Sequence, residues 1–219
     1  MKTIIKTKQG HFYIQKAIFN SIFSPFWIAR KELDKNIKEL SKKLTGKVLD
    51  IGAGSKPYKK YFTDYTSLEV EGKEADYNYK GKFPFNDNEF DSAICTQVLE
   101  HIFEPELFLG EINRVLKRGG KLLLTVPFVW DEHEQPYDYA RYSSFGLSYL
   151  LGKYFKVIEI RKTGDFSLMF QLLLMIFYKH NKKLTLMLTL PINIISQLFR
   201  WKIKDFYLDN VFMVKKQKI

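Results

Sequence analysis

An acid and two glycines directly follow a β-rich run in the stretch KVLDIGAGS, residues 47–55. Glycines at a strand-to-helix corner let a ligand lie against bare backbone, and the amides at a helix start favour a polar or anionic group. Glu69 ends the next β-rich run, where doubly wound folds place a carboxylate that accepts both ribose hydroxyls. Pro57 stands where a dinucleotide turn needs a third glycine, which disfavours a dinucleotide. The pattern predicts a nucleoside ligand, although a Gly-x-Gly turn can also be only a tight connection.

Short β-rich runs alternate with helical runs from Lys47 to about Lys162, which is typical of an α/β protein with a parallel sheet. The predicted strands are Val48–Ile51, Thr66–Val70, Phe90–Cys95, Lys121–Val126 and Lys156–Ile160, with a further candidate over Val211–Val214. Helices are predicted over Tyr58–Phe62 and Pro105–Leu116, the second ended by Gly119 and Gly120.

Two more helical zones flank this alternation. From Ile14 to Leu44 apolar residues recur at helical spacing, and Pro25 divides that zone. After Phe166 come two apolar stretches, FSLMFQLLLMIFY and LTLMLTLPINIISQLF. Both fall short of the roughly 18 to 20 apolar residues that a membrane-spanning helix needs. We therefore predict a helical leader over 1–45 and one domain over 46–219. Within that domain we expect a substrate-side loop and helix over 127–153 and an apolar helical cap or insertion over 165–203.

The chain has 35 basic and 24 acidic residues, a net charge of +11. Such a charge attracts nucleic acid, anionic lipid or an acidic substrate. The lysines are scattered in small groups, which favours a solvated surface over a nucleic-acid arm. The single cysteine, Cys95, excludes an intrachain disulfide framework and a cysteine-cluster metal site, and it fits a reducing compartment. Because the first residues lack the apolar stretch of a signal peptide, we expect no export and a cytoplasmic location.

Four ordered blocks carry a family resemblance: VLDIGAG, LEV, FPFNDNEFDSAICTQVLEHI and LKRGGKLLLTVP. Their order and spacing, from about Gly46 to Lys162, resemble the type 11 branch of the class I S-adenosylmethionine-dependent methyltransferases. The resemblance implies a doubly wound, mostly parallel seven-stranded sheet with helices on both faces, a helical N-terminal leader and a helical insertion before the last strand. It also implies S-adenosylmethionine as the cofactor.

The resemblance assigns nine positions of this chain to cofactor binding: Asp50, Gly52, Ala53, Gly54, Glu69, Val70, Tyr79, Thr96 and Gln97. The loop from Asp50 to Gly54 would lie under the methionine part, and Glu69 would hold the ribose. Thr96 and Gln97 would border the sulfonium, although their segment could also be an ordinary core corner. Tyr79 stands where many relatives have an aspartate facing the adenine, which would leave adenine to backbone groups or stacking. We expect Gly52→Val to abolish cofactor binding while leaving the fold intact.

Reactive residue types are dense between Pro127 and Ser143, after the fourth predicted strand. His133 is the best candidate for a base that removes the acceptor's proton, because an imidazole titrates near neutrality. Asp138 could orient His133, and Arg141 could bind an acidic substrate group. Equally, Asp138 and Arg141 could form a structural ion pair. His101 fits packing better than proton transfer, and neither His11 nor His180 has sequence partners for a metal site, so we expect none.

We predict methyl transfer to a small molecule, a sugar or glycan precursor, or a lipid-linked acceptor. The alternative is an RNA-binding or RNA-modifying protein. It is disfavoured because arginine-aromatic stripes and the Asn-Pro-Pro-Tyr clamp of base methyltransferases are missing from the sequence. The apolar stretches after Phe166 fit a cap over the acceptor, a homodimer contact, or a peripheral contact with the inner face of a membrane. In the membrane case Lys179, Lys182, Lys183, Arg200 and Lys202 would face anionic headgroups.

Overall fold

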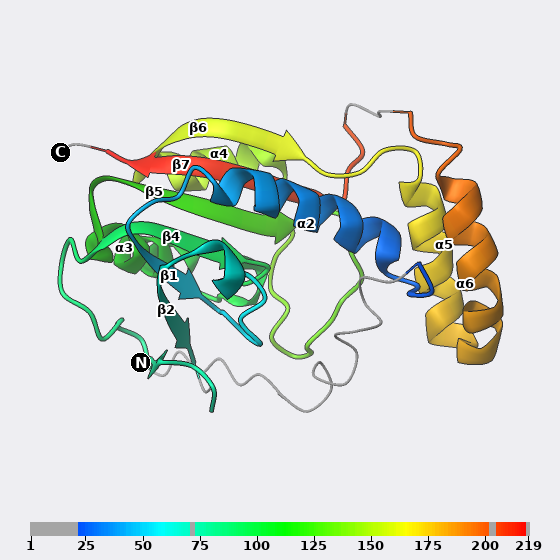
Figure 1. The fold of residues 1–219 in the computed structure, drawn as a ribbon, viewed down its shortest axis with the longest axis horizontal. Coiled ribbons are helices and arrows are strands. Elements are labelled where there is room, and N and C mark those ends of the chain that lie inside the picture. The colour runs from blue at the N-terminus through cyan, green and yellow to red at the C-terminus, as the bar shows by residue number, and fades with distance from the viewer. Residues whose placement is uncertain (1–21, 71–72, 202–204, 218–219) are drawn as a thin grey trace. The chain divides into compact units, whose positions relative to one another are not determined.

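The computed structural model describes residues 22–70, 73–201 and 205–217 (Figure 1). Its strands are β1 (Lys47–Ile51), β2 (Asp64–Glu69), β3 (Tyr77–Asn78), β4 (Phe90–Thr96), β5 (Leu116–Pro127), β6 (Phe155–Lys162) and β7 (Asp209–Lys216). Its α-helices are α2 (Trp27–Ser41), α3 (Pro105–Val115), α4 (Ser144–Gly152), α5 (Leu168–His180) and α6 (Lys182–Ser196), and two short 3-10 helices are η2 (Lys59–Tyr61) and η3 (Leu99–His101).

The seven strands form one sheet in the order β3-β2-β1-β4-β5-β7-β6. The pairs β1–β2, β2–β3, β1–β4 and β4–β5 are parallel, whereas β7 runs against β5 and β6 (Figure 1). From β1 the chain adds β2 and β3 on one side of the sheet. It then crosses to the other side of β1, where β4 and the later strands lie. In such sheets ligands bind beyond the carboxyl ends of the strands at this switch point. The predicted doubly wound, mostly parallel fold is confirmed.

The described chain divides into two compact units. The sheet unit holds residues 37–161 and 210–217, and the hairpin unit holds residues 22–36, 162–201 and 205–209. The helical leader is confirmed in α2, while its predicted part from Ile14 to residue 21 lies outside the described residues. The helical insertion is confirmed as α5 and α6, which precede β7.

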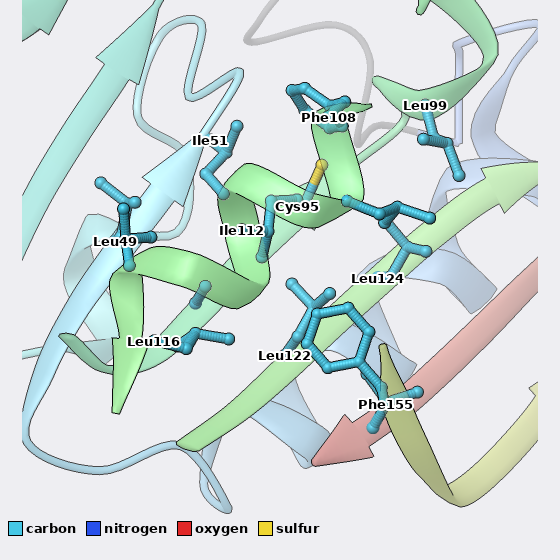
Figure 2. Close-up of a cluster of buried hydrophobic side chains, with 14 of the residues drawn as sticks. Leu49, Ile51, Cys95, Leu99, Phe108, Ile112, Leu116, Leu122, Leu124 and Phe155 are labelled. Atoms are coloured by element: carbon cyan, nitrogen blue, oxygen red, sulfur yellow. The ribbon is translucent and has the colours of Figure 1, made fainter. Parts of the chain in front are cut away.

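The core of the sheet unit lies between the sheet and the helices α3 and α4 (Figure 2). α3 turns its apolar stripe inward, and four of its residues are buried: Phe108, Leu109, Ile112 and Val115. Fully burying one such side chain stabilises the fold by about 1.5–3 kcal/mol. Cys95 of β4 lies in this cluster, and burial raises the pKa of its thiol well above the usual value. Cys95 is therefore a packing residue.

The largest differences from the predicted element boundaries lie at the start of β5 and in the segment after β1. α3 ends at Val115 and β5 begins at Leu116, five residues earlier than expected, with a shift in register between Phe90 and Ser92 of the facing strand. Gly119 and Gly120 thus lie in an irregular strand start, where a Cβ on Gly120 would stand 3.0 Å from the Asp91 carbonyl oxygen. The helix predicted over Tyr58–Phe62 is only η2, because β2 already begins at Asp64.

Candidate cofactor and acceptor site

The loop after β1 is fixed by its two glycines. Gly52 has φ +70°, and its amide donates to the Leu68 carbonyl over 2.9 Å. Gly54 has φ +50°, and its amide donates to the Glu69 carboxylate. Both glycines adopt the left-handed conformation that side-chain-bearing residues disfavour. The loop therefore ties the end of β1 directly to the end of β2.

The two glycines face different surroundings. A Cβ on Gly52 would lie 2.3 Å from Cγ2 of Val98, whereas a Cβ on Gly54 would meet no atom of the described residues within 4 Å. Gly54 therefore borders open space, where a ligand can reach the backbone. The expectation that Gly52→Val leaves the fold intact does not hold for this geometry, since the new side chain collides with Val98.

Asp50 is fully buried beneath this loop. Its Oδ2 accepts a hydrogen bond of 2.6 Å from the Tyr65 hydroxyl, and its Oδ1 has no hydrogen-bond partner among the described residues. Burial raises the pKa of Asp50 to about 7, although the Tyr65 hydrogen bond opposes the shift. A cationic ligand nearby would favour the ionised form of this carboxyl group.

Glu69 closes the other side of the corner. Burial raises its pKa, and the amides of Gly54 and Val70 partly offset this effect by donating to the carboxylate. The adjacent Asp76 accepts hydrogen bonds from the amide and hydroxyl of Ser67, and it lies 3.2 Å from the Lys56 ammonium group. This ion pair fixes the β1 loop to the segment that leads into β3.

The remaining predicted cofactor residues surround the same corner. Tyr79 is 8% exposed, packs edge-on against Phe83 at a centroid distance of 4.8 Å, and pairs its amide with the Glu69 carbonyl. Val70 packs against the core, and Ala53 is buried. The main chain of Tyr79 is thus hydrogen-bonded to that of Glu69, while the Tyr79 ring packs in the core.

Thr96 and Gln97 end β4 on the same side of the sheet. Gln97 has φ +55°, its amide donates to the Thr125 carbonyl over 2.9 Å, and its Nε2 donates to the Thr125 hydroxyl over 3.2 Å. These bonds hold the turn after β4 against β5. The carboxyl ends of β1, β2, β3 and β4 therefore bring the predicted cofactor residues to one edge of the sheet.

A second cluster joins the three predicted catalytic residues. The carboxylate of Asp138, almost fully buried, binds Arg141 through two hydrogen bonds of 2.5 and 2.6 Å. Its Oδ2 also accepts from the His133 amide over 2.9 Å and lies 3.3 Å from His133 Nδ1. Burial alone would raise the pKa of Asp138, but the hydrogen bonds from Arg141 and His133 lower it below the usual value. Asp138 is therefore an anion that holds both neighbours.

Arg141 directs its donors into the protein rather than outward. Besides Asp138, it donates to the main-chain carbonyls of Trp130, Asp131 and Ala140 over 2.9–3.5 Å. From the sequence, Arg141 could bind an acidic substrate group or form a structural ion pair with Asp138. In the structure its guanidinium is instead used to hold the loop from Trp130 to Ala140 in place.

His133 has one ring nitrogen engaged. Its Nδ1 lies 3.1 Å from the Asp131 carbonyl and 3.3 Å from Asp138, both nearer than the Arg141 nitrogen at 3.4 Å. Because both nearer groups are acceptors, Nδ1 carries the proton and Nε2 is left as the acceptor. The His133 ring meets the His101 ring edge-on at 4.8 Å.

His101 and Glu100 extend this cluster beyond the prediction. His101 Nδ1 lies 2.9 Å from the Tyr137 carbonyl, and its Nε2 lies 3.8 Å from the buried Glu100 carboxylate. Burial lowers the pKa of His101, which favours the neutral ring. The ligand atoms of Glu100, His101 and His133 lie within 4.8 Å of one another, a set that suits a divalent transition metal. The sequence could not pair these histidines, because His101 ends η3 and His133 lies in the loop after β5.

The two clusters are electrostatically linked. The charge of Glu134 contributes to raising the pKa of Glu69 and also acts on His101. The loop that carries His133 also contacts η3 directly, since the amides of Tyr139 and Ala140 donate to the Glu100 carbonyl over 2.9 and 3.3 Å. Two further residues of the site, Tyr65 and Asp76, escape sequence reasoning because their contacts depend on strand register.

Comparison with known proteins agrees with this architecture. Residues 49–124 match the family model described as a methyltransferase domain. An uncharacterized protein of Methanocaldococcus jannaschii, MJ1123, is 31% identical over 91 residues, which cover 37% of this chain and 44% of that protein. A second uncharacterized protein of that organism, MJ0638, matches over 110 residues, which cover 47% of its length. The chain therefore spans less than half the length of these curated relatives.

Solved structures show the same fold. The cyclase SpnF has a TM-score of 0.59 at 16% identity, covering 90% of this chain and 85% of that chain. A Haemonchus contortus phosphoethanolamine N-methyltransferase 2, solved with phosphomonomethylethanolamine and S-adenosylhomocysteine, has a TM-score of 0.58 at 17% identity, covering 96% and 58%. At these identities the similarity establishes architecture and leaves chemistry to the site. Residues 49–124 are therefore similar to a methyltransferase domain, and the sheet has the fold of the solved structures it resembles.

Proposed function

We propose that the chain transfers a methyl group from S-adenosylmethionine to a small molecule, a sugar or glycan precursor, or a lipid-linked acceptor. One observation carries the proposal most directly. The Glu69 carboxylate and the Gly54 amide meet at the carboxyl edge of the sheet, beside a glycine that borders open space. That arrangement supplies a ribose acceptor and a bare backbone within one corner.

The residues of the corner fit the cofactor chemically. Glu69 would hold the ribose hydroxyls, while the backbone of Ala53 and Gly54 would lie under the methionine part. Asp50, whose Oδ1 lacks a hydrogen-bond partner in the described structure, would face a cationic ligand favourably. Thr96 and Gln97 would border the sulfonium. When bound, S-adenosylmethionine supplies an electrophilic methyl group.

We assign acceptor activation to the cluster around His133. Direct displacement at a methyl group requires an aligned acceptor and, for a hydroxyl or ammonium group, removal of its proton. Nε2 of His133 is available to take that proton, because Nδ1 faces the Asp131 carbonyl and Asp138. Asp138 orients the ring and stabilises the imidazolium that forms. Arg141 acts as a positioning residue, since its donors hold the loop.

The location and partners remain part of the proposal. The buried, reduced Cys95 is compatible with the cytoplasm, and a peripheral position at the inner face of the membrane would suit a lipid-linked acceptor. A homodimer contact through the helical hairpin is the competing use of its apolar residues. We expect no nucleic-acid partner.

Incubation with radiolabelled S-adenosylmethionine tests the proposal against separate small-molecule, lipid and RNA fractions of a cell extract. We expect label in the small-molecule or lipid fraction, and its loss in Glu69→Gln. The exposed Glu74→Gln serves as the matched control and should transfer label normally. Label only in the RNA fraction would replace the proposed acceptor class by RNA. No label in any fraction from a protein that binds the cofactor would contradict the proposed transfer.

A further inference from the structure

Helix α6 has its polarity reversed relative to a helix of a water-soluble core. Its buried residues are all polar: Thr185, Thr189, Asn193 and Ser196. Its large apolar side chains are exposed instead, with Met187 at 75% and Leu186 at 63%. In water the hydrophobic effect would favour the opposite arrangement. The outer face of α6 is therefore suited to contact an apolar partner.

The buried polar residues form hydrogen bonds within the hairpin unit. The Asn193 amide donates to the carbonyls of Ile22 and Ser24 over 2.7 and 2.9 Å, and the Thr189 hydroxyl donates to the Thr185 carbonyl over 2.7 Å. Gln171 of α5 donates to the Pro25 carbonyl and accepts from the Ala29 amide. These bonds fix the orientation of both helices, so the outward apolar residues are a consequence of specific packing.

Exposed apolar residues occur on both helices of the hairpin, in which α5 and α6 lie side by side (Figure 1). We call them the apolar face: Met169, Leu173, Ile176, Leu184, Leu186, Met187, Ile194, Ile195 and Leu198. On α5 they recur at positions i, i+4 and i+7, which is one stripe of a helix. None of the described helices is long and apolar enough to cross a membrane.

Charge distinguishes the possible occupants of this face. Between Asp165 and Asp205 the sequence holds six lysines and arginines and no aspartate or glutamate. Lys182 and Lys183 are exposed at the start of α6. Arg200 does not contribute, because it forms ion pairs with Asp165 and Glu32, and Lys202 lies outside the described residues. A second copy of this cationic segment would be repelled, whereas anionic headgroups would be attracted.

We propose that the α5–α6 hairpin binds the surface of an anionic lipid bilayer. The apolar face lies among the acyl chains at the interface, while the lysines around Asn181 contact the headgroups. The proposal rests on the hairpin unit alone and is independent of methyl transfer.

Flotation of the full-length protein with phosphatidylcholine vesicles, with and without phosphatidylglycerol, tests the proposal. We expect flotation with the anionic vesicles. Met187→Glu/Leu198→Glu should lower the bound fraction about tenfold or more, because two exposed apolar anchors become charged. Lys182→Gln/Lys183→Gln should lower binding to anionic vesicles about fivefold for each lysine removed. Leu107→Glu, at an exposed position of α3, and Lys38→Gln/Lys42→Gln, at exposed positions in and directly after α2, are the matched controls and should float normally.

Circular dichroism and cofactor titration on each variant separate a binding defect from unfolding. A protein that stays at the bottom of the gradient with anionic vesicles overturns the proposal. Flotation that both double variants leave unchanged overturns it as well, since another surface then binds. A dimer in light scattering that Met187→Glu/Leu198→Glu dissociates, without vesicle binding, would show that a second copy covers the apolar face.

Discussion

At the scale of single residues, the candidate cofactor corner combines two carboxyl groups with different hydrogen-bond partners. Asp50 is buried beside Tyr65, while Glu69 accepts backbone hydrogen bonds from Gly54 and Val70. Burial raises the pKa of both carboxyl groups, because it disfavours their ionised forms. Packing elsewhere in the fold has to offset the free-energy cost of burying them. The charge state of this corner is therefore sensitive to pH.

Asp50 should make the folded protein less stable as the pH rises from about 4 to 7. Its pKa rises from 3.8 to about 7 on folding, so in this range the folded state binds more protons than the unfolded state, and stability falls. Three pKa units correspond to about 4 kcal/mol. In urea unfolding across this range, Asp50→Asn should lack this decline, because its side chain stays uncharged.

The exposed Asp64→Asn is the matched control from the same part of the fold and should follow the wild-type curve. Parallel pH profiles for Asp50→Asn and the wild type would show that Asp50 is ionised in the folded protein throughout, contrary to this account.

His133→Ala should lower kcat by about 10²- to 10⁴-fold, the usual range for loss of a general base, and should leave cofactor affinity within about twofold. Asp138→Asn should give a smaller loss of kcat because the ring is retained and only its orientation is lost. Stopped-time methyl-transfer assays and titration with S-adenosylhomocysteine measure the two effects separately. His180→Ala, at an exposed position of α5, should be indistinguishable from the wild type.

The same assay distinguishes a base from a metal ligand. We expect the wild-type rate to be unchanged by a chelator. Loss of activity with the chelator, restored by a divalent metal, would instead assign His133 to a metal centre with His101 and Glu100.

At the scale of elements, the sequence predicts strands and helices well where periodicity and burial agree. β1, β4 and α3 appear close to their expected bounds, since each has a continuous apolar run or stripe. The start of β5 could not be predicted, because Lys117 to Gly120 look like a helix end. Only the neighbouring strand, with its shifted register at Phe90 and Ser92, shows that they belong to the sheet.

Gly120→Ala should destabilise the fold by about 1–3 kcal/mol, the cost of forcing a methyl group into a packed site. Its Cβ would meet the Lys117 and Asp91 carbonyl oxygens at 2.9 and 3.0 Å. Gly152→Ala, at the end of α4, is the control and should be neutral or stabilising, because its Cβ would meet no described atom within 4 Å. Thermal unfolding compares the two variants, and equal melting temperatures would contradict the close approach.

The two glycines of the β1 loop should separate stability from ligand binding. Gly52→Ala should lose both, because its methyl group collides with Val98. Gly54→Ala should keep most of its stability, with a cost of about 1–2 kcal/mol for the left-handed conformation, yet bind the cofactor more weakly because the methyl group enters the open space. Thermal unfolding and calorimetry measure each quantity. Full cofactor affinity in a folded Gly54→Ala would place the ligand elsewhere.

At the scale of the whole molecule, the family resemblance predicts the order of the sheet and the edge at which the candidate site lies. It does not predict the contacts that depend on how loops return, such as His101 with His133 or Asp50 with Tyr65. The sequence also does not predict the inverted polarity of α6. Its sequence reads as an apolar stretch, and only burial shows that Thr185 and Asn193 face inward.

The net charge of +11 is consistent with the hairpin proposal, because the segment between Asp165 and Asp205 is exclusively basic among its charged residues. A segment that carries only basic charges is attracted to an anionic surface, such as a bilayer with anionic headgroups. The nucleoside corner and the hairpin lie in different units, so each can be tested without disturbing the other.

The central claim is that an adenosine-bearing methyl donor binds where Gly54 meets Glu69. Isothermal titration calorimetry with S-adenosylhomocysteine, on the wild type, Glu69→Gln and the control Glu74→Gln, tests it most directly. We expect saturable binding to the wild type and to Glu74→Gln, with affinity about tenfold or more weaker in Glu69→Gln, since hydrogen bonds to charged groups contribute about 1.5–3 kcal/mol. No heat of binding in the wild type, or equal affinity in all three proteins, would contradict the claim.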